Sequence, residues 1–199
     1  MSGSEGIIKF NLEWKEAEIL IPEPCFSLLN DCRKRLCGLN LIGETPDGTG
    51  YGNVSVKINR KNHFYISGSG TGGTEKSYRH HYALVESYNL AGNSVVCSGL
   101  AKASSESLTH AAIYEYNDRA KAVIHVHSPV PWNKYKDRIP TTPRDAEYGT
   151  PEMASAIRPM MRIPEVLNRG IIIMGGHEDG ILVFGTSLQE AEKRLLKLM

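Results

Sequence analysis

The chain has 199 residues, and its 23 basic and 22 acidic side chains leave a formal net charge of +1. A chain of this length can bury its own core, so we expect one domain over residues 1–199 with a peripheral segment at 1–24. The near-neutral charge argues against a nucleic-acid-binding protein, which should carry a basic excess. No apolar run approaches the roughly 18 residues of a membrane span, and the polar, acidic start is not that of a signal peptide. We therefore expect a soluble, cytoplasmic protein that contacts no membrane.

The first half of the chain alternates between helical and extended patterns. Periodic apolar residues predict a helix over 27–39. Apolar and polar residues alternate at 53–58, and this run and the one at 63–67 are predicted to be strands joined as a hairpin by a polar bend. A glycine-rich loop follows, and we then predict a helix over 75–88 and a strand over 94–99.

The second half continues the alternation from a predicted helix cap at Ser104–Ser105. That helix should run to about Asn117. The remaining expected elements are a strand at 122–128, a polar loop at 129–149, a helix from Pro151 interrupted at Pro159 and Pro164, strands at 170–174 and 180–185, and a last helix opened by Ser187 and Glu190. Short strands among helices predict an α/β fold with a mixed or antiparallel sheet.

The cysteines are at positions 25, 32, 37 and 97 and have none of the spacings of a metal site. In a protein that is not secreted, free thiols are expected.

Two histidines, His125 and His127, are two positions apart in the predicted strand at 122–128. Residues i and i+2 of a strand point to the same face, so the two imidazoles should converge. With a third histidine from elsewhere, such a pair can hold Zn²⁺ and leave a fourth position open. His177, in the turn between the last two strands, is the candidate third ligand. The alternative is that His125 and His127 are half-buried polar residues with ordinary partners.

Glu106 follows Ser104 and Ser105 in the first turn of a predicted helix. The helix dipole favours a carboxylate there, so a capping role alone would explain it. Beside a metal, the same carboxylate can move a proton to or from a carbon acid. His110, one turn later, is expected to be a packing residue rather than a fourth ligand.

The loop GSGTGG at 68–73 matches the GxGxxG pattern of dinucleotide-binding sites. Such a site needs a second parallel strand that ends in an acidic residue about 20 positions later. Here that stretch is predicted as helix, and the next strand ends in Cys-Ser-Gly. The loop fits better as backbone N–H groups and hydroxyls around a single phosphate, or as a glycine turn with no ligand.

Several segments together resemble the class II aldolase/adducin family, and they occur in the order of that family. They are Gly52-Asn53-Val54-Ser55, Ile66-Ser67-Gly68-Ser69-Gly70, Ser104-Ser105-Glu106, His125-Val126-His127-Ser128, and His177 with the strand and helix that follow it. The resemblance implies a three-layer α/β/α fold around a largely antiparallel central sheet. It also implies a homotetramer with active sites at the subunit interfaces.

The resemblance further implies a zinc-dependent lyase and assigns residues to it. His125, His127 and His177 correspond to the zinc ligands, Glu106 to the catalytic carboxylate, and Asn53, Ser69, Gly70, Ser104 and Ser105 to the cradle of a substrate phosphate. The implied reaction is aldol cleavage of a small phosphorylated ketose through a metal-stabilised enediolate. Three imidazoles also accept Mn²⁺, Co²⁺ or Fe²⁺.

Some positions depart from the family pattern and leave alternatives open. His177 precedes Glu178 and Asp179 where the family has glycine, and these acids are expected to lengthen a turn. The tyrosine general acid of some family aldolases has only two candidates here, Tyr135 and Tyr148. A sugar-phosphate dehydratase remains an alternative, whereas the 4-epimerases of the family tend to carry aspartate in place of Glu106. A non-catalytic adducin-like binding domain would lack the three histidines.

Overall fold

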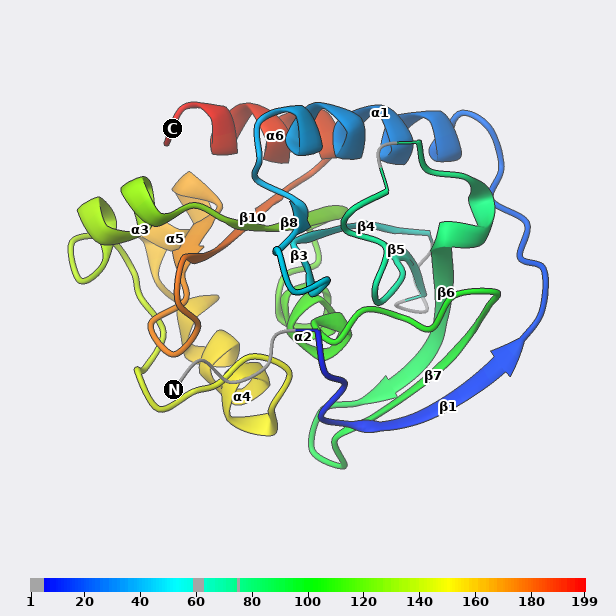
Figure 1. Ribbon diagram of the computed structural model, residues 1–199. Helices are drawn as coiled ribbons and strands as arrows, with labels where there is room; N and C mark the ends of the chain where they lie inside the picture. Colours follow the sequence, from blue (N-terminus) through cyan, green and yellow to red (C-terminus); the bar gives the residue numbers. More distant parts are fainter. Residues whose placement is uncertain (1–5, 59–62, 75) are drawn as a thin grey trace.

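A central sheet divides the protein into layers (Figure 1). The computed structural model describes residues 6–58, 63–74 and 76–199, and within these ranges eight strands form the sheet. In order across the sheet they are β1 (Asn11–Glu16), β7 (Ser94–Gly99), β6 (Tyr82–Asn89), β5 (Phe64–Ser67), β4 (Asn53–Lys57), β8 (Ala122–His127), β10 (Gly180–Gly185) and β9 (Ile171–Ile173). All neighbours pair antiparallel except β1 and β7, which are parallel. A short separate hairpin joins β2 (Gly43–Glu44) to β3 (Gly50–Tyr51).

Helices cover both faces of the sheet, as the three-layer prediction requires (Figure 1). One face carries α1 (Cys25–Gly38) and α6 (Leu188–Leu196), and the other carries α2 (Ser107–Tyr116) and α4 (Pro151–Met160). The shorter helices are α3 (Pro129–Tyr135), α5 (Pro164–Arg169) and the 3₁₀ turn η1 (Arg79–His81). None of the helices in the described ranges is long and apolar enough to cross a membrane.

The alternation of side chains on β8 decides which layer contains the candidate site. Ile124 packs in the apolar cluster under α1 and α6, while Val123 packs in the cluster under α2 and α4. Because successive strand residues point to opposite faces, His125 and His127 lie on the same side as Val123. The HxH pair therefore faces the layer that contains α2.

The helix predicted over 75–88 is wrong, and residue 75 itself lies outside the described residues. The segment instead forms η1 and then β6, which pairs antiparallel with β5 and β7. Tyr82 and Val85 are buried in this strand, and aromatic and β-branched residues suit a position between two other strands. The antiparallel pairing also excludes the dinucleotide fold, which needs a parallel crossover after the glycine loop.

Other differences from the prediction are small. The loop expected at 129–149 begins with α3, where Pro129 occupies a first-turn position that suits its fixed φ. Helix α4 runs through Pro159 to Met160, and Pro164 opens α5. The hairpin of β4 and β5 is confirmed, although residues 59–62 of its bend lie outside the described residues. The cysteines are free, as expected.

The amino-terminal segment, expected to be peripheral, adds β1 to the edge of the sheet. Its Phe10 side chain is buried in the apolar cluster under α2 and α4. Ile21, further along the segment, is buried in the opposite cluster. The segment is therefore packed against both layers of the fold.

Candidate metal and phosphate site

Three histidines meet at one end of the central strands. His125 and His127 lie on β8, and His177 lies in the turn between β9 and β10. Strand β10 pairs with β8 so that Gly180 is opposite His127, which brings the turn back to the end of β8. One ring nitrogen from each histidine lies within 4.8 Å of the others. The structure therefore brings the predicted ligands together.

The donor set fits a divalent ion. His127 Nε2 and His177 Nε2 are 3.0 Å apart, close to the roughly 3.3 Å between two nitrogens on one tetrahedral zinc. His125 Nε2 is buried without a hydrogen-bond partner among the described residues. Burial, followed by the neighbouring His127 ring, holds the pKa of His125 and of His177 well below the usual value. Neutral imidazole is the form that binds a metal.

Glu106 lies beside this cluster at the start of α2. It is the N-cap residue of the helix, and its backbone N–H donates to Ser104 Oγ at 3.2 Å. The cap is therefore Glu106, and not Ser104–Ser105 as predicted from the sequence. The Glu106 side chain is only 2% exposed, and Oε1 lies 3.9 Å from His177 Nε2. This places a carboxylate next to the third histidine.

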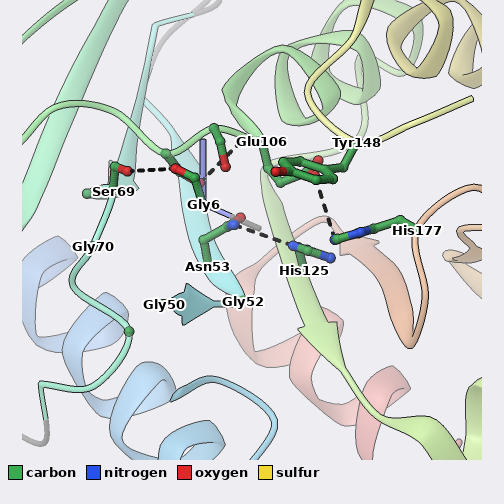
Figure 2. A pocket seen from close by; sticks show the side chains of 14 residues that line it. Gly6, Gly50, Gly52, Asn53, Ser69, Gly70, Glu106, His125, Tyr148 and His177 are labelled. Carbon is green, nitrogen blue, oxygen red and sulfur yellow. Dashed lines mark hydrogen bonds and ion pairs between the residues drawn. The ribbon is translucent and has the colours of Figure 1, made fainter. Parts of the chain in front are cut away.

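A single pocket brings the predicted phosphate residues to the same place (Figure 2). Its described lining includes all the predicted cradle residues, namely Asn53, Ser69, Gly70, Ser104 and Ser105. Glu106, His125 and His177 line it as well, whereas His127 is not among its lining residues. The lining also contains Gly6 and Gly50, which the sequence did not indicate, and Gly52, Gly68 and Gly72, which belong to segments that it did indicate. None of its described lining residues is lysine or arginine.

Close backbone packing explains why the loop after β5 is rich in glycine. A Cβ atom at Gly72 would overlap the carbonyl oxygen of Gly43 in the β2–β3 hairpin. Gly70 has a φ of +70°, in the left-handed region, and open space where its side chain would be. The loop can thus present backbone to a ligand at close range.

The Asn53 side chain contacts a histidine as well as the pocket. Asn53 is opposite His125 in the pairing of β4 with β8. Its Nδ2 lies 3.4 Å from His125 Nδ1 (Figure 2). When Nε2 of His125 binds a metal, Nδ1 carries the proton and must donate it. In that state the Asn53 amide turns its Oδ1 toward the ring and accepts this hydrogen bond, which fixes the ring orientation.

Of the two candidate tyrosines, Tyr148 reaches the site. Its ring lies 4.7 Å from the His177 ring, and the residue lines the pocket (Figure 2). Tyr135, in contrast, packs against the apolar cluster under α1 and α6. In the turn after His177, Glu178 is exposed, and Asp179 has a φ of 62°.

A buried polar chain runs from the start of α2 into the core. Ser55 Oγ lies 2.7 Å from His110 Nδ1 and 2.7 Å from the Tyr114 hydroxyl. All three residues are fully buried. His110 and Tyr114 are four residues apart on α2 and share one helix face, and the N-cap residue Glu106 precedes His110 by the same spacing. His110 thus bonds to β4, and it is not one of the three clustered histidines.

Comparison with known proteins agrees with this geometry. Residues 39–131 match the family model described as Class II Aldolase and Adducin N-terminal domain. No curated protein sequence matches the chain.

Similar solved structures share the fold. An L-fuculose 1-phosphate aldolase superposes with a TM-score of 0.68 and 22% identity, covering 90% of this chain and 84% of that one. The L-fuculose-1-phosphate aldolase from Thermus thermophilus gives a TM-score of 0.64 and 20% identity, covering 87% and 88%. A sugar-phosphate aldolase from Thermotoga maritima gives 0.59 and 17%, covering 87% and 90%. At these identities the likeness shows the fold alone. It confirms the predicted three-layer architecture, while the family-model match over residues 39–131 supports the resemblance stated from the sequence.

Proposed function

Because residues 39–131 belong to the class II aldolase/adducin family, we propose that the protein is a metal-dependent aldolase that cleaves a small phosphorylated ketose. The observation that carries the proposal is a cluster of three histidine rings, two of which line one pocket together with the buried Glu106 carboxylate and the glycine-rich loop. The similar structures include aldolases named for sugar phosphates. The substrate we propose is a ketose 1-phosphate.

In the proposed site, His125, His127 and His177 hold the ion, with Zn²⁺ as the first candidate. A bound divalent ion supplies Lewis-acid stabilisation of negative charge on the substrate oxygens. Asn53 orients the His125 ring through its contact with Nδ1.

The phosphate is assigned to the loop residues Ser69 and Gly70 together with Ser104 and Ser105. Hydroxyls and backbone N–H groups bind a phosphate without a permanent positive charge. These contacts are remote from the bond that breaks, so they position the substrate.

Glu106 is assigned the proton transfer. In a ketose 1-phosphate, the electron pair of the C3–C4 bond moves into an enediolate over C2 and C3. The C4 hydroxyl loses its proton as the aldehyde leaves, and Glu106 delivers a proton to C3. The products are an aldehyde and dihydroxyacetone phosphate. Tyr148, which contacts His177, is the candidate to exchange the proton with the C4 oxygen.

The reverse half-reaction gives a test that does not depend on knowing the aldehyde. Zinc-loaded protein in D₂O should exchange one proton at C3 of dihydroxyacetone phosphate, which NMR follows directly. Glu106→Gln should keep the zinc and the fold but lose at least about a hundredfold in exchange rate, as is typical for the loss of a general base. Glu178→Gln is the matched control, because Glu178 is an exposed acid in the turn after His177. Absence of exchange by the wild-type protein would contradict the proposal.

Two other functions on the same scaffold give different results. A sugar-phosphate dehydratase would release water and no aldehyde from its ketose phosphate, so a screen for aldehyde release separates it from an aldolase. A non-catalytic binding domain of the adducin type would exchange no proton. The three clustered histidines favour an enzyme over such a domain.

A further inference from the structure

The amino-terminal segment reaches the candidate site, although it precedes the matched domain at 39–131. Gly6 lines the pocket, and its carbonyl oxygen accepts a hydrogen bond from Ser69 Oγ at 3.4 Å (Figure 2). The Gly6 backbone, with a φ of +80°, lies against Thr49 and Gly50. Gly6 therefore lies at the part of the pocket assigned to the phosphate.

Hydrogen bonds to the backbone groups of Lys9 and Asn11 fix this placement. The side-chain amide of Asn93 donates to the carbonyl oxygen of Lys9 at 3.0 Å, and the backbone N–H of Asn11 donates to that of Asn93 at 2.9 Å. Phe10 is only 7% exposed. Strand β1 then continues the pairing along β7. Lys9 is thus held at a defined position between Gly6 and β1.

The Lys9 ammonium lies over the ring of Tyr148, which lines the pocket. Lys9 Nζ lies 3.9 Å from the centre of the Tyr148 ring and 3.0 Å from Glu147 Oε2. The Lys9 side chain is 25% exposed and that of Glu147 is 67% exposed. Solvent therefore screens the carboxylate more than the ammonium. Since Tyr148 contacts His177, the charge of Lys9 acts next to the histidine cluster.

A phosphorylated substrate is an anion, and no described lining residue of the pocket is lysine or arginine. A positive charge close to the pocket would therefore add attraction to the contacts from hydroxyls and backbone N–H groups. We propose that the amino-terminal segment is a wall of the substrate site and that Lys9 on it supplies this charge, selecting anionic over neutral substrates. The inference rests on the proposed function and adds a specificity-determining residue to it. The attraction acts across several ångströms, so its effect should be moderate.

The test compares a phosphorylated ligand with its unphosphorylated, neutral form. KM for deuterium exchange is measured with dihydroxyacetone phosphate and with dihydroxyacetone, and inorganic phosphate binding is measured by calorimetry. For Lys9→Met, KM for the phosphorylated ligand should rise about threefold to tenfold, and phosphate affinity should fall to match, while KM for dihydroxyacetone stays constant. Lys9→Arg should restore the wild-type values, because arginine keeps the charge and the ring contact.

Lys15→Met is the matched control, because it removes one lysine from the same segment at an exposed position. Glu147→Gln should leave the phosphate affinity unchanged or raise it. The proposal fails if Lys9→Met changes nothing, if it affects both ligands equally, or if Glu147→Gln weakens phosphate binding as much as Lys9→Met does. A wild-type protein that neither binds phosphate nor exchanges protons would instead remove the proposed function itself.

Discussion

Replacing His110 with glutamine should remove one part of the acid sensitivity of the protein, in addition to the parts that come from the buried His125 and His177. Burial lowers the pKa of His110 from its ordinary 6.5 to about 3. The unfolded chain takes up this proton near pH 6.5, so below that pH the unfolded state binds more protons than the folded state. The stabilisation of the folded state that goes with neutral His110 is therefore fully present above about pH 6.5, and it is lost as the pH falls toward 3.

The size of the effect follows from this difference in pKa. From about pH 6 to about pH 4.5, linkage predicts that His110 alone lowers the free energy of unfolding by about 2 kcal/mol. Glutamine does not titrate in this range, and its amide can accept the hydrogen bond from Ser55, which lies 2.7 Å from His110 Nδ1. Over the same interval of pH, the free energy of unfolding of His110→Gln should fall by about 2 kcal/mol less than that of the wild-type protein.

Urea unfolding at several pH values measures this difference. Both proteins are kept metal-free with a chelator, because proton release on metal binding would add its own pH dependence. His80→Gln, at an exposed histidine, is the matched control for loss of a histidine. Parallel curves of unfolding free energy against pH for wild type and His110→Gln would refute the reasoning, whatever constant offset separates them.

Two further predictions concern the pocket. Changing Ser104 and Ser105 together to alanine should raise KM for a phosphorylated substrate at least about tenfold more than KM for its dephosphorylated form. Equal effects on the two KM values would show that these residues do not bind the phosphate. Tyr148→Phe should lower the rate of aldol cleavage by about a hundredfold yet leave proton exchange into dihydroxyacetone phosphate unchanged, because exchange involves no C4 oxygen. Tyr135→Phe is the control, and a cleavage rate unaffected by Tyr148→Phe would exclude that hydroxyl as the acid.

Local sequence rules were sufficient where the deciding contacts are local. The two-residue period of a strand placed His125 and His127 on one face, and the structure has both on β8. The capping pattern of Ser187 is confirmed, since its side chain accepts from the backbone N–H of Glu190. The turn between the last two predicted strands made His177 the candidate third ligand, but its approach to the other two histidines depends on the distant pairing of β10 with β8.

The remaining contacts depend on pairing between strands that are far apart in the sequence. The segment 82–89 is a strand because β5 and β7 lie on either side of it, and its own residues do not specify that arrangement. The contact of Asn53 with His125 depends on the register of β4 against β8. Lys9 reaches Tyr148 because β1 pairs with β7, more than 80 residues away in the chain. No periodicity in residues 1–24 indicates that contact.

The central claim is that three imidazoles share one ion, and the amount of metal bound per chain tests it most directly. Protein loaded with Zn²⁺ and dialysed free of excess should retain about one zinc per chain by elemental analysis. His127→Asn and His177→Asn should each lose most of it, while Glu106→Gln retains it. A wild-type protein that retains no zinc, or histidine variants that retain as much as wild type, would contradict the account.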